Sequence, residues 1–101
     1  MIDLKQQEYY HELFDLYHSL LTTKQQAYFN LYFFEDLSLA EIAENENVSR
    51  NAIHLNINKT IKYLLSYEQK LQLYHKYQEI VQHIEDENLL NEITNILKKS
   101  D

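Results

Sequence analysis

The sequence contains no glycine, no proline and no cysteine among its 101 residues. Without glycine the chain cannot form the phosphate-binding loops of nucleotide-dependent enzymes or the sharp turn that presents a catalytic serine, because both need backbone that glycine alone adopts at low cost. Without cysteine it has no disulfide, no thiolate nucleophile and no cysteine-ligated zinc site. These absences argue against nucleotide-dependent and thiol chemistry.

Long apolar runs are also missing. No stretch approaches the roughly 18 consecutive apolar residues of a membrane-spanning helix, and the first ten residues lack the basic and apolar parts of a signal peptide. With 101 residues, of which 45% are hydrophobic, the chain is long enough for one core and too short for two. We expect a single domain over residues 1–101 that acts in the cytoplasm, without membrane contact.

Apolar residues recur at helical spacing along almost the whole chain, whereas the alternation typical of strands is missing. The pattern predicts an all-α fold with helices at about 3–20, 22–34, 38–45, 49–65, 69–85 and 89–97. On the core side of the first two helices we expect Leu4, Leu13, Leu16, Tyr17, Leu20, Ala27, Leu31 and Phe34. The core stripe of the fourth helix should be Ile53, Ile57, Ile61 and Leu64.

Several helix boundaries are marked by side chains that can bond the free backbone N–H groups of a first turn. Ser38 precedes Glu41 by three residues, which is the spacing of a capping box. Thr22 and Thr23 each have a glutamine at the same distance, so either can begin the second helix. Ser66 also has a glutamine three residues later and predicts a break after the fourth helix.

The segment at about 38–65 has the form of a helix-turn-helix motif. Asn47 takes the place that glycine usually occupies in the turn, because asparagine tolerates left-handed backbone, and Ser49 caps the second helix. The candidate nucleic-acid or partner-binding residues on this helix are Arg50, Asn51, His54, Asn58, Lys59 and Lys62. The alternative is a solvated helix face on which Arg50 pairs with Glu46.

The charge of the chain is unusual for a nucleic-acid-binding protein. Residues 1–21 contribute -3, residues 22–67 contribute -1 and residues 68–101 contribute -3 to the formal net charge of -7. From residue 49 to 65 the only charged side chains are Arg50, Lys59 and Lys62. The second helix of the motif is thus a local cluster of positive charge in an acidic protein, which favours phosphate contact over strong binding by one molecule alone.

The order of elements resembles region 4 of sigma-70-type factors: Leu21-Thr22-Thr23-Lys24-Gln25-Gln26, the acidic corner Glu35-Asp36, Ser38-Leu39-Ala40-Glu41-Ile42-Ala43, then Val48-Ser49-Arg50. The continuation from Thr60 to Leu71, followed by Leu73-Tyr74, is similar to the YlxM family of small bacterial helix-turn-helix proteins. This resemblance implies an accessory or regulatory role in the signal recognition particle pathway, through the RNA of that particle, its GTPase or both. It also implies a sigma-70 region 4-like core with additional N- and C-terminal helices.

Three functions therefore compete. The first is the signal recognition particle factor that the resemblance implies, and the second is a small dimeric DNA-binding transcription regulator. The third is a protein-interaction module that keeps helix-turn-helix geometry without binding nucleic acid. All three are non-enzymatic, and we expect no catalytic residue, no cofactor and no metal.

The C-terminal helices, at about 68–99, carry more apolar surface than a three-helix core needs, and we expect them to form a homodimer. The candidate dimer interface is Leu71, Tyr74, Tyr77, Val81 and Ile84. The alternative is that these helices fold back onto the core of the same chain.

Two weaker patterns favour structural explanations. The nine tyrosines recur at helical spacing beside aliphatic residues, so core packing is favoured over a stacking platform for bases. His75, Glu79 and His83 step by four along one helix, which is more typical of a solvated surface than of a metal site.

Overall fold

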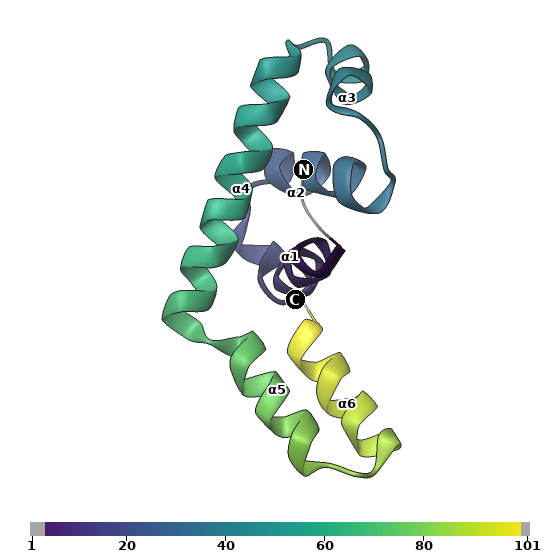
Figure 1. Cartoon of the computed structure of the whole chain (residues 1–101), viewed down its shortest axis with the longest axis vertical. Coiled ribbons are helices and arrows are strands. Elements are labelled where there is room, and N and C mark those ends of the chain that lie inside the picture. Colours follow the sequence, from purple (N-terminus) through teal and green to yellow (C-terminus); the bar gives the residue numbers. More distant parts are fainter. Residues whose placement is uncertain (1–3, 100–101) are drawn as a thin grey trace.

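The computed structural model describes residues 4–99, which form helices joined by short connections and contain no strand (Figure 1). The all-α prediction is confirmed. Two helices are extended by a turn of different pitch: a 3₁₀ segment, His18–Leu20, follows α1, and a π-helical segment, Asn30–Phe34, follows α2. The helices are α1 (Leu4–Tyr17), α2 (Thr23–Phe29), α3 (Leu39–Glu46), α4 (Arg50–Leu71), α5 (Leu73–His83) and α6 (Glu87–Lys98).

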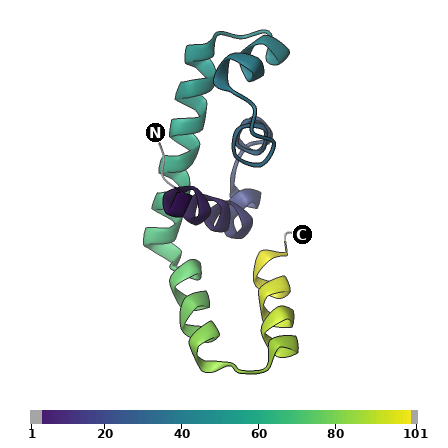
Figure 2. The same cartoon turned by 45° about the vertical axis from the view of Figure 1, so that its right-hand side comes forward.

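The longest helix, α4, organises the molecule. Helices α1, α2 and α3 all pack against it, as Figure 1 shows. Helices α5 and α6 form a hairpin that leaves the end of α4 and extends away from the other helices (Figure 2), and the molecule measures 47 × 27 × 24 Å. The helix-turn-helix segment and the hairpin therefore lie at opposite ends of the long axis.

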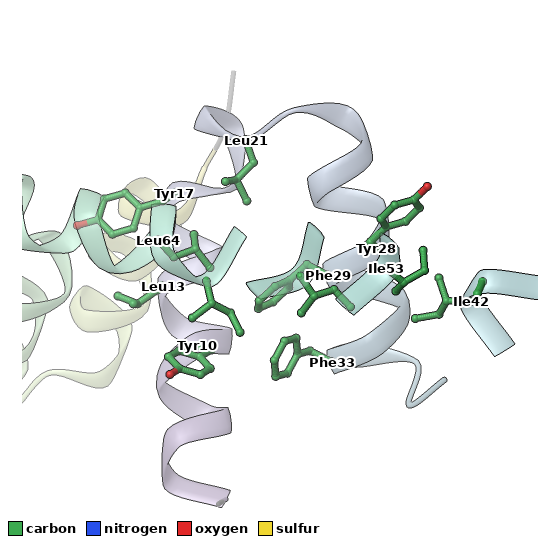
Figure 3. Packing of buried hydrophobic residues seen from close by; sticks show 13 residues of the cluster. Tyr10, Leu13, Tyr17, Leu21, Tyr28, Phe29, Phe33, Ile42, Ile53 and Leu64 are labelled. Atoms are coloured by element: carbon green, nitrogen blue, oxygen red, sulfur yellow. The ribbon is translucent and has the colours of Figure 1, made fainter. Parts of the chain in front are cut away.

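The core joins the first four helices (Figure 3). Leu13 of α1, Phe29 of α2, Ile42 of α3, and Ile53 and Leu64 of α4 are completely buried. The Phe29 ring stacks on the ring of Phe14, with 4.5 Å between centroids, and on that of Phe33, at 4.3 Å. Because such close packing resists rearrangement, α3 and α4 are held in a fixed orientation on α1 and α2.

The predicted inner face of α2 was wrong at two of its three positions. Ala27 and Phe34 are exposed, and Leu31 packs partly buried against the core, which Tyr28, Phe29 and Phe33 fill. The three aromatic side chains lie on a neighbouring stripe of the helix and remove more apolar surface from water than an alanine does. Within α1 and its extension, Leu4 and Leu20 are also exposed, because the packed part of α1 is its middle and second half.

The predicted turn is confirmed. Asn47 has φ 60° and ψ 41°, and its N–H donates to the carbonyl oxygens of Ala43 and Glu44. Ser38 and Glu41 form both hydrogen bonds of the capping box, each 3.1 Å long. The Ser49 side chain accepts a 3.0 Å hydrogen bond from the N–H of Ala52 and begins α4. Asn47 thus replaces the missing glycine in the turn, and Ser49 caps the helix that follows it.

The predicted break at Ser66 was wrong, because α4 continues to Leu71 and ends at Gln72, whose φ is 55°. The buried carboxylate of Glu68 accepts hydrogen bonds from the backbone N–H groups of Tyr74 (3.0 Å) and His75 (3.1 Å), and so caps α5. The predicted interface residue Leu71 is therefore the last residue of α4 and not part of the next helix.

Candidate nucleic-acid interface

The first half of α4 presents an exposed polar surface. All six predicted contact residues are exposed: Arg50, Asn51, His54, Asn58, Lys59 and Lys62. Arg50 is the first residue of α4, immediately after the Ser49 cap, so the turn fixes where its side chain leaves the backbone. The packing of α4 on α1, α2 and α3 leaves this surface uncovered.

The structure brings three of these residues together. Arg50, His54 and Asn58 lie at spacings of four along α4, and they line one cavity of about 260 Å³. Asn58 Nδ2 lies 3.1 Å from His54 Nε2. The remaining lining residues are Tyr32, Leu39, Ile57 and Ile61.

The other cations lie elsewhere on the helix. Lys59 follows Arg50 by nine residues, which is about two and a half helical turns, so the two side chains leave opposite sides of α4. The ammonium of Lys59 lies 5.8 Å from the ring centroid of Tyr63, a distance typical of a cation–π contact. The predicted set is thus one cavity-lining group of three, with Lys59, Lys62 and Asn51 exposed outside it.

Arg50 is free to meet an external anion. The alternative pairing with Glu46 is not formed, and within residues 4–99 Arg50 makes no ion pair with any carboxylate. Helix α4 carries Lys59, Lys62 and Lys70 in addition to Arg50, whereas its one acidic residue, Glu68, is buried and engaged in capping α5. The exposed charge of α4 is therefore positive in a chain whose formal net charge is -7.

Sequence reasoning missed the far wall of the cavity. Tyr32, in the π-helical segment, and Leu39, at the start of α3, face Arg50, His54 and Asn58 across it. The periodicity assigned Tyr32 to the core, and it does pack against the Phe33 ring at 5.0 Å. Tyr32 also lines the cavity because of the way α2 packs against α4, and no local pattern in the sequence indicates that packing.

The structure does not bring the histidines and Glu79 of α5 together as a metal site. The His75 imidazole pairs with the carboxylate of Glu79 at 3.2 Å on the exposed surface of α5. In the part of the chain that the structure describes, no three His, Cys, Asp or Glu side chains are placed to hold one metal ion. No helix over the same residues is long and apolar enough to cross a membrane.

Comparison with known proteins agrees with this geometry. A family model described as "UPF0122: Putative helix-turn-helix protein, YlxM / p13 like" matches residues 4–100. A UPF0122 protein of Bacillus velezensis is 54% identical over 67 residues, which are 66% of this chain and 61% of the relative. UPF0122 proteins of Bacillus cereus (strain AH187) and Bacillus anthracis (strain A0248) are 55% identical over the same shares. The match thus spans less than two thirds of these relatives' length, and the chain belongs to the UPF0122 family of YlxM/p13-like helix-turn-helix proteins.

Proposed function

We propose that this protein is a non-enzymatic accessory or regulatory factor of the signal recognition particle pathway, and that it contacts the particle's RNA through the first half of α4. The observation that carries the proposal is the exposed, cationic surface of α4, with Arg50 unpaired among the described residues. In a protein of formal net charge -7, such a surface is favourable for meeting phosphate groups. The pathway itself rests on the family resemblance, and a cytoplasmic location is part of the same proposal.

The number of cations sets the mode of binding. Specific nucleic-acid-binding proteins commonly make about 6 to 10 phosphate contacts, and the first half of α4 offers Arg50, Lys59 and Lys62. One molecule alone should therefore bind nucleic acid weakly at physiological salt. A particle that supplies a second contact, for example through its GTPase, would raise the effective concentration and remove this limit.

A second candidate is a small dimeric transcription regulator that binds DNA. It is favoured by the α3–turn–α4 arrangement, in which an exposed second helix can enter a major groove. Both candidates predict binding that weakens steeply with salt, whereas a module that binds only protein predicts no such dependence for nucleic acid.

The test compares the wild type with the double variant Arg50→Ala plus Lys59→Ala in two assays. One assay measures binding to random RNA and DNA, and the other measures binding to the reconstituted signal recognition particle. A double variant Lys5→Ala plus Lys76→Ala is the matched control, because it removes the same charge from exposed positions outside α4.

We expect the α4 variant to lose most of its particle binding, by about tenfold or more, and the control variant to keep it. Tight, sequence-specific DNA binding by the isolated wild type would favour the transcription regulator instead. Full particle binding by the α4 variant would place the contact surface elsewhere.

A further inference from the structure

Helix α4 differs in charge from the rest of the chain. Of the nine basic residues it carries four, Arg50, Lys59, Lys62 and Lys70, and of the 16 acidic residues it carries one, the buried Glu68. Every other acidic residue belongs to another part of the chain. The exposed surface of α4 is therefore free of carboxylates, and phosphate groups should meet the protein there and not on the acidic surfaces around it.

Three of these cations, Lys59, Lys62 and Lys70, form a row along α4, which we call the lysine row. Lys59 and Lys70 are about three helical turns apart in the sequence, so their side chains leave α4 within about 20° of each other and about 16.5 Å apart along its axis. Lys62 leaves the helix between them, within about 80° of Lys70. The lysine row thus continues past the helix-turn-helix segment into the second half of α4.

The lysine row lies on the side of α4 that faces away from the other helices. Its lysines are offset by nearly half a turn from the buried residues of α4, which are Ile53, Ile57, Thr60, Ile61, Leu64 and Glu68. Figures 1 and 2 show α1, α2 and α3 on one side of α4, and within residues 4–99 no helix covers the other side. All three lysines are exposed and make no ion pair with a described carboxylate. The row is therefore accessible to a large partner.

The chemistry of the lysine row suits a sugar–phosphate backbone. A lysine ammonium is a point charge on a flexible stem, without the planar fork that bonds two atoms of a base edge at once, so it favours phosphate contact over base reading. One strand of a duplex presents a phosphate about every 3.4 Å along the axis, so the about 16.5 Å between Lys59 and Lys70 spans about five phosphates. A backbone that lies along α4 can therefore meet all three lysines together.

The aromatic residues beside the row favour a duplex over a single strand. Proteins that hold single strands without sequence preference stack the bases on accessible aromatic rings. Of the two tyrosines of α4, Tyr67 is half-buried and Tyr63 is exposed. The Tyr63 ring already contacts the Lys59 ammonium, 5.8 Å from its centroid, and the Tyr67 ring, at 6.3 Å and an angle of 19°. The row thus offers charge and no unoccupied stacking platform.

We propose that a nucleic-acid duplex lies along the lysine row, with its sugar–phosphate backbone bonded by Lys59, Lys62 and Lys70. Lys70, which lies outside the helix-turn-helix segment, is then a contact residue, and binding does not depend on base sequence. The inference rests on the proposed function. It extends the contact from the first half of α4 to its end, and it names a duplex as the part of the RNA that binds.

The experiment measures the affinity of the full chain for labelled RNA by fluorescence anisotropy, between about 50 and 200 mM salt. The probes are a short RNA duplex of mixed sequence, a duplex of shuffled sequence, and one of the strands alone. The variants Lys70→Gln and Lys62→Gln plus Lys70→Gln remove charge from the row. Lys76→Gln is the matched control, because Lys76 is an exposed lysine of α5 that makes no ion pair with a described carboxylate.

We expect the wild type to bind the two duplexes with affinities within about twofold of each other, and the single strand more weakly. The slope of log affinity against log salt concentration should fall by about 1 in Lys70→Gln and by about 2 in the double variant, and Lys76→Gln should keep the wild-type slope. Equal slopes in Lys70→Gln and Lys76→Gln, tighter binding of the single strand, or a strong preference for one duplex sequence would overturn the proposal. The absence of duplex binding at the lowest salt would also overturn it and would favour an acidic protein surface as the ligand of the row.

The two proposals can fail separately. Loss of particle binding in the Arg50 and Lys59 variant, together with an unchanged salt slope in Lys70→Gln, would leave the proposed function standing and reject the duplex along the lysine row. Duplex binding that depends on Lys70, together with no binding of the wild type to the signal recognition particle, would reject the pathway and retain the lysine row as a duplex-binding surface.

Discussion

Asn47 is the residue on which the helix-turn-helix geometry depends most directly. Its backbone is left-handed, with φ 60°, which asparagine tolerates better than most residues with a β-carbon. A β-branched residue at this position adds steric strain in the folded state alone.

The variant Asn47→Val should therefore unfold at lower urea concentration than the wild type, by about 1 to 2 kcal/mol in the free energy of unfolding. The free energy of unfolding of Asn47→Gly should lie within about 0.5 kcal/mol of the wild-type value, because glycine adopts this conformation without strain. Urea denaturation followed by circular dichroism measures both. A valine variant as stable as the wild type would show that the turn does not need left-handed backbone.

Tyr17 and Glu68 join three helices through one buried group of hydrogen bonds. The Tyr17 hydroxyl donates to Glu68 Oε1 at 2.6 Å and accepts from the backbone N–H of Leu73 at 3.0 Å. Burial of the hydroxyl, reinforced by the bond to the Glu68 carboxylate, raises the pKa of Tyr17 above its usual value. The folded state therefore holds this proton more tightly than the unfolded state does.

This shift predicts a loss of stability at alkaline pH. Above the unfolded-state pKa of about 10, the unfolded chain releases the Tyr17 proton while the folded chain retains it, so the free energy of unfolding falls as pH rises. In Tyr17→Phe this part of the decline should disappear, and stability at neutral pH should drop by about 1 to 3 kcal/mol because Glu68 and Leu73 lose a partner.

Tyr67→Phe is the matched control, because its hydroxyl makes only an exposed 3.3 Å bond to the carbonyl oxygen of Leu20. It should change neutral stability by less than about 1 kcal/mol. Denaturation curves between neutral and alkaline pH provide the measurement. If the free energy of unfolding fell equally with pH in the wild type and in Tyr17→Phe, the raised pKa of Tyr17 would not be a cause of the alkaline loss of stability.

At the scale of elements, local chemistry in the sequence predicted helix starts better than helix ends or faces. Ser38 and Ser49 act within three residues of their own position, so their capping roles can be read without knowing the fold. Gln72 could not be predicted as a helix end, because its left-handed conformation is supported by Glu68 and by the following helix. The prediction of the inner face of α2 was wrong for a similar reason. The residues that pack against its aromatic stripe are distant in sequence, so local periodicity does not identify them.

The candidate site also has a part that the sequence displays and a part that only the packing of the helices creates. Arg50, His54 and Asn58 lie on one helix at a regular spacing, which the sequence displays directly. Tyr32 and Leu39 come from two other elements and join the site only when α2, α3 and α4 pack. The cavity therefore emerges only at the tertiary level.

Helix α6 is held to the body by polar contacts more than by packing. No residue of α6 is fully buried. The Lys98 ammonium pairs with the carboxylates of Glu12 at 3.1 Å and Asp15 at 3.3 Å on α1. Partial burial of the ammonium lowers its pKa, but the two carboxylates outweigh this effect, so that the pKa of Lys98 is raised.

The variant Lys98→Met should loosen α6 selectively. Methionine keeps the length of the side chain and loses the charge, so amide hydrogens of α6 should exchange faster while those of α1 and α4 change little. Lys76→Met, at an exposed position of α5, is the control and should leave exchange in α6 unchanged. Hydrogen exchange measured by mass spectrometry decides the matter, and equal exchange in both variants would show that packing alone holds α6.

At the scale of the whole molecule, the predicted dimer interface is only partly used within one chain. Tyr74 packs against the Tyr9 ring at 5.1 Å, and the Tyr77 hydroxyl accepts a 3.1 Å hydrogen bond from Thr94. Val81 and Ile84 are half-buried, and Leu71 is exposed. The hairpin also leaves Leu89 and Ile96 exposed, the latter by 72%. Apolar surface thus remains at the end of the molecule farthest from the helix-turn-helix motif.

We predict that the chain forms a homodimer through this surface, because exposed apolar side chains gathered on one part of a molecule favour association. Sedimentation at micromolar concentration should give about twice the chain mass of 12.3 kDa, and Leu71→Glu plus Val81→Glu should restore the single mass. Leu55→Glu, at an exposed leucine of α4 outside the interface, is the control. A wild-type mass near 12.3 kDa would reject the dimer. A dimer has twice the cations of one α4, which approaches the about 6 to 10 phosphate contacts of specific nucleic-acid-binding proteins. The affinity of the monomeric variant for nucleic acid should therefore depend less on salt concentration than that of the wild type.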